Sequence, residues 1–160
     1  MGIEPTFKMT DIRKQLEKKA DLIRRQIIRR LMSLGEMCIG EARTNKGYED
    51  QTGALTSSIG YVVVDHGKVI RLAGFEKPMT AAIDSTGTAD DGVLEGKQLA
   101  ESLANKVSTK GYALIVVAGM HYAMHVEAMG LNVIGSSELL AERQLPEMLR
   151  KLKGNISKMN

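Results

Sequence analysis

The segment DQTGALTSSIGYVVV, residues 50–64, decides the fold because a turn signal leads directly into an alternating apolar pattern. The Thr-Gly pair at 52–53 is typical of a turn, since glycine permits backbone angles that other residues resist. From Leu55 onward, every second residue lies on one face of an extended chain. We therefore predict a strand that begins here, with Leu55 and Ile59 on its core face and Ser58 on the other face.

The same segment is similar to the Asp-Thr-Gly signature of aspartic proteases. Those enzymes need contiguous residues because the catalytic carboxylate sits at the tip of a tight loop and faces a second aspartate. Here Gln51 separates Asp50 from Thr52, and the second copy, DSTG at 84–87, is interrupted in the same way. We therefore interpret residues 50–53 as a backbone turn without catalytic chemistry.

Upstream, an amphipathic helix is predicted from Thr10 to about Glu41. Thr10 or Asp11 can cap its start, and Gly40 lies close to its expected end. Its apolar positions recur every three or four residues and form one stripe of roughly eight turns. The stripe consists of Ile12, Leu16, Ala20, Ile23, Ile27, Leu31, Leu34 and Cys38.

Four basic residues, Lys14, Lys18, Arg25 and Arg29, gather almost opposite this stripe. Such a face is either a solvated outer surface, which we favour, or a surface that meets DNA or an acidic partner.

The formal net charge of +3 conceals an uneven distribution along the chain. Residues 8–30 hold nine Lys or Arg and three Asp or Glu, and residues 143–160 hold five and one. The middle of the chain, residues 31–142, holds eight and fourteen. Basic ends and an acidic middle favour head-to-tail pairing between copies, and basic ends also fit a nucleic-acid backbone.

Downstream of the opening segment, VVVDHGKVIRLAGF at 62–75 is typical of a hairpin with His66-Gly67 near its turn. Residues 76–111 form an excursion from the sheet, flexible in its first half, with a short helix from Val93 to Val107. YALIVVAG at 112–119 is apolar on both faces, which suits a central strand.

The C-terminal third is predicted to contain one more short strand, LNVIG at 131–135, and a last helix. MHYAMHVEAMG at 120–130 fits either an extension of the preceding strand or a helical turn. Ser136 or Ser137 caps the last helix, which kinks or restarts at Pro146 because proline clashes with the carbonyl of Glu142. We expect one domain over residues 1–160, with frayed ends at 1–9 and 154–160.

Composition narrows the class of protein. The apolar fraction is 43% and the charged fraction 26%, which are ordinary values for a globular protein. Cys38 is the one cysteine, so an internal disulfide is excluded and a reducing compartment is favoured. No apolar run approaches the roughly 20 residues of a membrane span, and we expect a cytoplasmic protein without membrane contact.

Two further groups of residues are candidates for a metal site or a catalytic site. His121 and His125 have metal-ligand spacing if they lie on a helix, with Glu127 as a third ligand, but the zinc-protease pattern requires Glu where Tyr122 stands.

A Ser/His/Asp relay would combine Ser57 or Ser58 with Asp65 and His66. Nothing resembles a nucleophile elbow, and the adjacent Asp and His in a turn are poorly placed to orient one another. We therefore predict no catalytic residues, no cofactor and no metal.

With its neighbours, the opening segment is similar to a family of tailed-bacteriophage proteins. These are the small tail-completion or head–tail joining (neck) proteins, also described as minor tail or morphogenesis proteins. The resemblance covers nearly the whole chain, and two segments carry it: an Asp/Pro-x-Thr-Gly-x-Leu-x-x-Ser-Ile segment and a later Tyr-Ala-x-x-Val-Glu-x-Gly segment. The matching residues are Thr52, Gly53, Leu55, Ser58, Ile59, Tyr122, Ala123, Val126 and Glu127. The chain departs from the family where AMGLN at 128–132 replaces the usual Gly-Thr, and in the length of residues 76–111.

The resemblance implies an α+β fold: a long N-terminal helix, a curved, mostly antiparallel sheet of four or five strands, one inserted helix and a C-terminal helix. It implies a structural virion protein without enzymatic activity that forms rings and docks to connector or tail-tube proteins. Such a protein is found in the host cytoplasm during assembly, and later in the virion neck or tail.

The alternative is a basic nucleic-acid-binding protein that uses Lys14, Lys18, Arg25 and Arg29.

Overall fold

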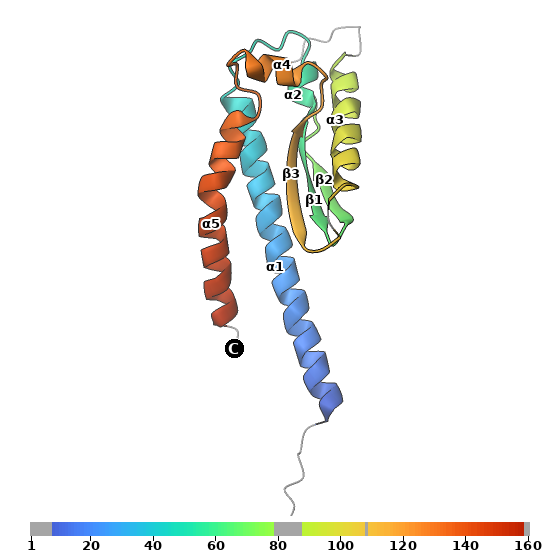
Figure 1. Ribbon diagram of the computed structural model, residues 1–160, viewed down its shortest axis with the longest axis vertical. Coiled ribbons are helices and arrows are strands. Elements are labelled where there is room, and N and C mark those ends of the chain that lie inside the picture. The colour runs from blue at the N-terminus through green and yellow to red at the C-terminus, as the bar shows by residue number, and fades with distance from the viewer. Residues whose placement is uncertain (1–7, 79–87, 108, 159–160) are drawn as a thin grey trace, which may run out of the picture.

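The computed structural model describes residues 8–78, 88–107 and 109–158. The fold is α+β, as predicted, with a long N-terminal helix, an antiparallel sheet and a C-terminal helix (Figure 1). In chain order the elements are α1 (Met9–Thr44), α2 (Ala54–Ser57), β1 (Ile59–Asp65), β2 (Lys68–Ala73), α3 (Thr88–Ala104), β3 (Tyr112–Ala118), α4 (Ala123–Ala128) and α5 (Gly135–Ser157).

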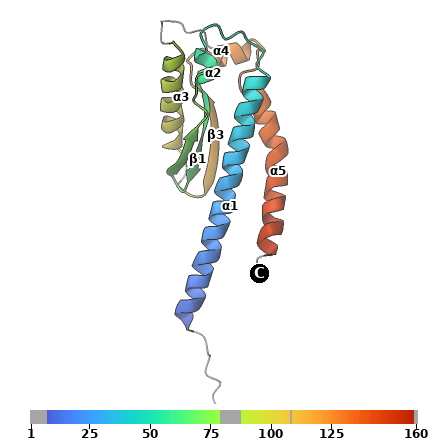
Figure 2. The same ribbon diagram turned by 180° about the vertical axis from the view of Figure 1, so that it is seen from behind.

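The sheet lies between two helices, with α1 on one face and α3 on the other, and α5 packs on α1 away from the sheet (Figures 1 and 2). The residues of β1 alternate between two buried clusters. Ile59, Tyr61 and Val63 share one cluster with Ile39 of α1. Val62 and Val64 share the other cluster with Ala100 of α3. Because helices cover both faces, all seven residues of β1 are buried.

The strand order is β2-β1-β3, and both pairs are antiparallel. The described residues contain three strands, so the predicted four or five are not confirmed. The segment LNVIG, predicted as a strand, is instead a loop that leads into α5. Its amides at Val133 and Ile134 are bound by the carboxylate of Glu127 at 2.9 Å each, and not by a neighbouring strand.

β3 is an edge strand, so its prediction as the central strand is wrong. The apolar pattern of residues 112–119 has a different cause: α1 and α3 extend over both faces of this edge as well as over β1. Leu114 and Val116 pack against the α1 cluster, and Ala113 and Ile115 against the α3 cluster. The apolar residues on both faces of β3 are therefore explained by a helix packed on each face. They do not indicate a central position in the sheet.

The predicted hairpin is confirmed as the connection between β1 and β2. His66 and Gly67 have φ angles of 48° and 79°. Positive φ at both central residues is the requirement of a type I′ turn, whose twist matches that of the paired strands. The register shifts once between Val63 and Val64, because Ile70 of β2 is left without a partner and forms a local bulge in that strand.

α1 begins at Met9 and continues past Gly40 to Thr44, so both predicted ends differ from the structure. No side chain caps its start; Asp11 lies in the first turn, and its amide donates to the carbonyl of Lys8 at 2.8 Å. Gly40 is exposed within the helix and does not end it. Only the C-terminal part of the predicted stripe is buried, beginning with Leu34.

α5 begins at Gly135 and neither serine acts as its cap. Ile134 is the N-cap residue and makes no side-chain cap bond, while Oδ1 of Asn132 accepts from the amide of Ser136 at 2.8 Å. The helix runs through Pro146 to Ser157 as one element, so of the two predicted outcomes, a kink or a restart, the restart does not occur. Residues 154–157, predicted to be frayed, are helical.

The inserted helix, α3, begins at Thr88, five residues before its predicted start, and ends at Ala104. The segment predicted as flexible includes residues 79–87, which lie outside the described residues.

Candidate functional site

The structure brings together the two segments that carry the family resemblance. Leu55, Ile59 and Ala123 belong to one buried cluster, and Tyr122 and Val126 pack against it. The two segments are separated by more than 60 residues in the chain, yet they meet at the end of the sheet where β1 begins and β3 ends. We call this contact between residues 50–59 and 119–127 the motif junction.

The first segment is held by side chains that bond to its backbone. The carboxylate of Asp50 accepts from the amide of Thr56 at 2.7 Å, and Gly53 has a φ of 75°. The chain therefore turns into the short helix α2, and β1 begins only at Ile59. The predicted strand at Leu55 is wrong, although Leu55 and Ile59 do reach the same buried cluster. Asp50 is thus a capping residue in this structure.

Ser58 is the polar centre of the junction. Its hydroxyl is fully buried, donates to the carbonyl of Leu55 at 2.8 Å, and accepts from the amides of Gly119 and Met120 at 3.1 and 3.3 Å. These bonds join the start of β1 to the end of β3. Because the Ser58 hydroxyl is hydrogen-bonded to three backbone groups, it stabilises the junction and does not face a substrate.

Close backbone contacts attach α3 to the same place. A Cβ at Gly96 would lie 2.5 Å from the carbonyl oxygen of Ser58, and one at Gly92 would lie 2.1 Å from that of Ala54. Such distances are too short for any side chain, so only glycine permits this approach. Ser57 adds a hydrogen bond from its hydroxyl to the carbonyl of Ala89 at 2.8 Å.

The second segment orders the start of α5 through Glu127. One carboxylate oxygen accepts from the amides of both Val133 and Ile134. His121 and His125 are exposed, and His121 packs edge-to-face on Tyr122 with ring centroids 5.1 Å apart. Within the described residues, no group of three or more His, Cys, Asp or Glu side chains is placed to hold a metal ion.

A pocket of about 370 Å³ opens between the two segments. Thr52 and Tyr122 line it together with two carboxylates, Asp91 and Glu95. Burial raises the pKa of the Tyr122 phenol, and the negative charges of Asp50 and Glu95 raise it further. The pocket thus combines acids with a phenol that stays protonated, and its lining contains neither a nucleophile beside a base nor a cation.

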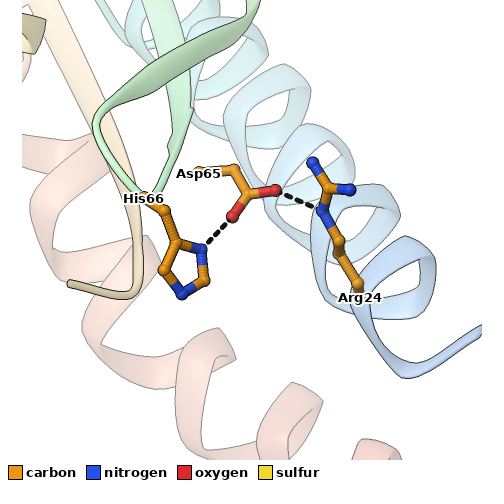
Figure 3. A network of polar contacts seen from close by, with 3 residues as sticks. All are labelled: Arg24, Asp65 and His66. Carbon is orange, nitrogen blue, oxygen red and sulfur yellow. Dashed lines mark hydrogen bonds and ion pairs between the residues drawn. The ribbon is translucent and has the colours of Figure 1, made fainter. Parts of the chain in front are cut away.

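The other end of β1 carries an ion-pair network (Figure 3). Asp65 is 2% exposed; its carboxylate accepts from Nε of Arg24 at 2.5 Å and is hydrogen-bonded to Nδ1 of His66. Burial opposes ionisation of Asp65, but the bonds from His66 and Arg24 outweigh it and lower its pKa.

The sequence interpretation of the adjacent Asp and His as poorly placed is therefore wrong, since the turn brings them into contact. Ser57 and Ser58 nevertheless lie at the opposite end of β1, roughly 20 Å away for a strand of this length, so the imagined relay does not form.

The predicted basic face is exposed along its whole length. Lys14, Lys18, Arg25 and Arg29 are all exposed, and none forms an ion pair with another described residue. Arg24, beside this face, turns toward the sheet and was not singled out in the sequence. The sequence gives no signal for the pair of Arg24 and Asp65, because the two residues are 41 positions apart in the chain.

Cys38, predicted as part of the apolar stripe, is buried between α1 and α5. Its carbonyl accepts from the hydroxyl of Ser137 at 2.6 Å, and burial raises the pKa of its thiol.

No protein-family model matches this chain, and comparison with curated proteins and with solved structures likewise finds no match. In the part of the chain that is described, no helix is both long enough and apolar enough to cross a membrane.

Proposed function

We propose that this chain is a structural virion protein of a tailed phage or prophage, acting in tail completion or head–tail joining by ring-type self-assembly and docking to neighbouring virion proteins. The observation that carries the proposal is the motif junction. The residues on which the family resemblance rests lie in two distant segments of the sequence, and the fold brings these segments together at the motif junction. A shared architectural role accounts for this convergence, because Asp50, Ser58 and Glu127 each accept hydrogen bonds from backbone amides.

The use of the polar groups in the junction supports a role in assembly and not in catalysis. Asp50, Ser58 and Glu127 are side chains of types found in active sites, and all three accept hydrogen bonds from backbone amides. An active site requires such groups to face a substrate with their protons or lone pairs available. We therefore propose that the chain has no enzymatic activity.

Exposed apolar side chains support self-association. Large apolar residues are exposed at the N-terminal end of α1, on α4 and on α5, for example Leu16 at 63%, Met124 at 82% and Leu139 at 61%. A closed ring needs two different complementary patches on each subunit. The uneven charge distribution offers one basic and one acidic partner surface for such a contact.

The test of this proposal is loss of the gene from a lysogen that encodes the chain. We expect filled heads and separate tails in place of joined particles, and we expect an epitope-tagged chain to be located at the neck or tail end by immunogold electron microscopy. Purified protein mixed with portal–connector complexes should add density to the connector. Normal infectious particles that lack the chain would contradict the proposal.

A second function, binding of duplex DNA, is favoured by the exposed and unpaired basic face of α1. The variant in which Lys14, Lys18, Arg25 and Arg29 become Glu should abolish binding in an electrophoretic titration, and binding should fall steeply with salt. The matched control replaces four exposed lysines elsewhere with Glu, namely Lys68, Lys97, Lys106 and Lys153. Tight binding at about 150 mM salt that only the first variant loses would favour this function over a purely structural one.

A further inference from the structure

The N-terminal end of α1 projects beyond the end of α5, the helix that packs beside it. The hydroxyl of Ser137 on α5 donates to the carbonyl of Cys38 on α1 at 2.6 Å, which sets the register of the two antiparallel helices. Both helices rise about 1.5 Å per residue, so the end of α5 at Ser157 lies roughly level with Lys18. Figures 1 and 2 both show α1 continuing past the end of α5.

Three apolar side chains lie on this projecting end. Met9, Ile12 and Leu16 are spaced by three and four residues, so they share one face of the helix. Their exposed fractions are 78%, 38% and 63%. We call residues Met9 to Leu16 the tip; its apolar face is the continuation of the surface that α5 covers further along α1.

An apolar pocket of about 440 Å³ lies at the opposite end of the molecule. Its apolar lining comes from the end of β3, from α4 and from the loop before α5. Glu127 is also in the lining, but its carboxylate is engaged by backbone amides. The apolar residues are Ala118, Ala123, Met124, Ala128, Val133 and Ile134. The volume falls within the range of concave sites that enclose apolar groups, roughly 300–1,000 Å³.

The charges around the tip and the pocket are complementary. Residues 8–19 hold five Lys or Arg and two Asp or Glu, whereas residues 119–142 hold three Glu and no Lys or Arg. Two of these acids, Glu138 and Glu142, are exposed and follow Ile134 at intervals of four residues. They therefore continue the face of α5 that begins at the pocket edge, where they can meet the basic residues of an incoming tip.

We propose that the tip of one copy docks into this pocket of a second copy, an inference that rests on the self-assembly in the proposed function. A copy cannot fill its own pocket, because α1 is about 54 Å long and separates the tip from the pocket. The contact joins two different surfaces, so each copy keeps one free tip and one free pocket. Repetition of such a contact produces a ring if the rotation closes and an open chain if it does not.

The experiment uses two variants of the full chain at exposed positions, analysed by sedimentation velocity at increasing concentration in low salt. Leu16→Lys removes the apolar anchor of the tip, and Ala128→Lys places a charge in the pocket. Wild-type protein should form assemblies that grow with concentration. Each variant alone should stay monomeric, and an equimolar mixture should form dimers and nothing larger, because one intact tip and one intact pocket remain for each pair.

Controls separate docking from other causes. Circular dichroism checks that the variants fold, and Met124→Lys, at the 82% exposed rim, serves as a second pocket variant. Leu149→Lys, 55% exposed on α5, is the matched control for Leu16→Lys and should assemble like wild type.

Three results would overturn the inference. Self-association of Ala128→Lys alone would indicate tip-to-tip pairing. Equal loss of assembly in Leu149→Lys would indicate unspecific apolar contact. A wild-type protein that is monomeric up to about 1 mM would exclude the contact. A monomer that still binds portal–connector complexes refutes only this inference, whereas failure to join heads and tails in the lysogen test refutes the proposed function.

Discussion

The two halves of α1 have the same apolar periodicity and opposite environments. In the C-terminal half, which packs against both the sheet and α5, Leu34 and Cys38 are 2% and 1% exposed. In the N-terminal half, Leu16 occupies an equivalent position on the stripe and is 63% exposed. The comparison teaches that a periodic pattern predicts a helix and the direction of its apolar face, but that burial depends on whether a partner reaches that face.

The largest expected effect on stability comes from comparing the same leucine-to-alanine substitution in the two halves of α1. Leu34→Ala should lower the free energy of unfolding by about 2–5 kcal/mol, because it leaves a cavity at a buried position. Leu16→Ala should change it by less than about 0.5 kcal/mol, since the side chain is already exposed to solvent. Urea unfolding at low protein concentration measures both values. Equal losses would show that the N-terminal half is covered in the isolated chain.

The next effect contrasts two glycines in the C-terminal half. A Cβ at Gly35 would lie 2.6 Å from the buried ring of Tyr61, whereas nothing lies within 4 Å of one at Gly40. Gly35→Ala should therefore lower the free energy of unfolding by about 1–3 kcal/mol through overpacking. Gly40→Ala should raise it by about 0.5–1 kcal/mol through better helix propensity. A Gly35→Ala variant as stable as wild type would refute the close contact between α1 and β1.

A smaller effect tests the ion pair that ties the N-terminal half to the sheet. The folded pKa of Asp65 is lowered, so its stabilising contribution is fully present above the ordinary aspartate pKa of about 3.9 and is lost as the pH falls through the folded pKa. Stability of Asp65→Asn should therefore depend less on pH than that of wild type between pH 5 and 2, in a series of thermal unfolding curves. The control, Glu17→Gln on the exposed part of α1, should keep the wild-type profile.

The smallest effect is expected at the tip. Ile12→Gln should change the free energy of unfolding of the monomer by less than about 0.5 kcal/mol and should keep the helical signal in circular dichroism, because glutamine is a good helix former. The same change at Ile39, which is 4% exposed in the α1 cluster, should cost several times more. A strong loss at Ile12 would mean that the tip packs against this chain.

Local signals predicted the elements whose partners are near in sequence. The stripe of α1 indicated a long helix, and His66-Gly67 indicated the hairpin, because both depend on neighbouring residues. The helical turn α2 was missed, since the bond from Asp50 to the amide of Thr56 is invisible to a period-two pattern. The prediction of β3 as a central strand is wrong, because its apolar sequence indicates that both faces are covered. It does not indicate which strands lie beside it.

The candidate site was predicted in part. The family resemblance proposed from the sequence singled out Ser58 and Glu127, but their bonds to residues 119–120 and 133–134 depend on the fold. The spacing of Gly92 and Gly96 was the available signal for the close approach of α3, since small residues four apart form one face of a helix.

The sequence by itself determined where this chain is helical or extended over most of its length, how charge is divided along it, and which face of α1 is apolar. These properties follow from residues three or four positions apart and from backbone preferences. Only the tertiary structure decided that α5 ends near Lys18, that the two motif segments meet, and that the tip and the pocket lie at opposite ends. These features depend on contacts between residues far apart in the chain, which a local pattern does not encode.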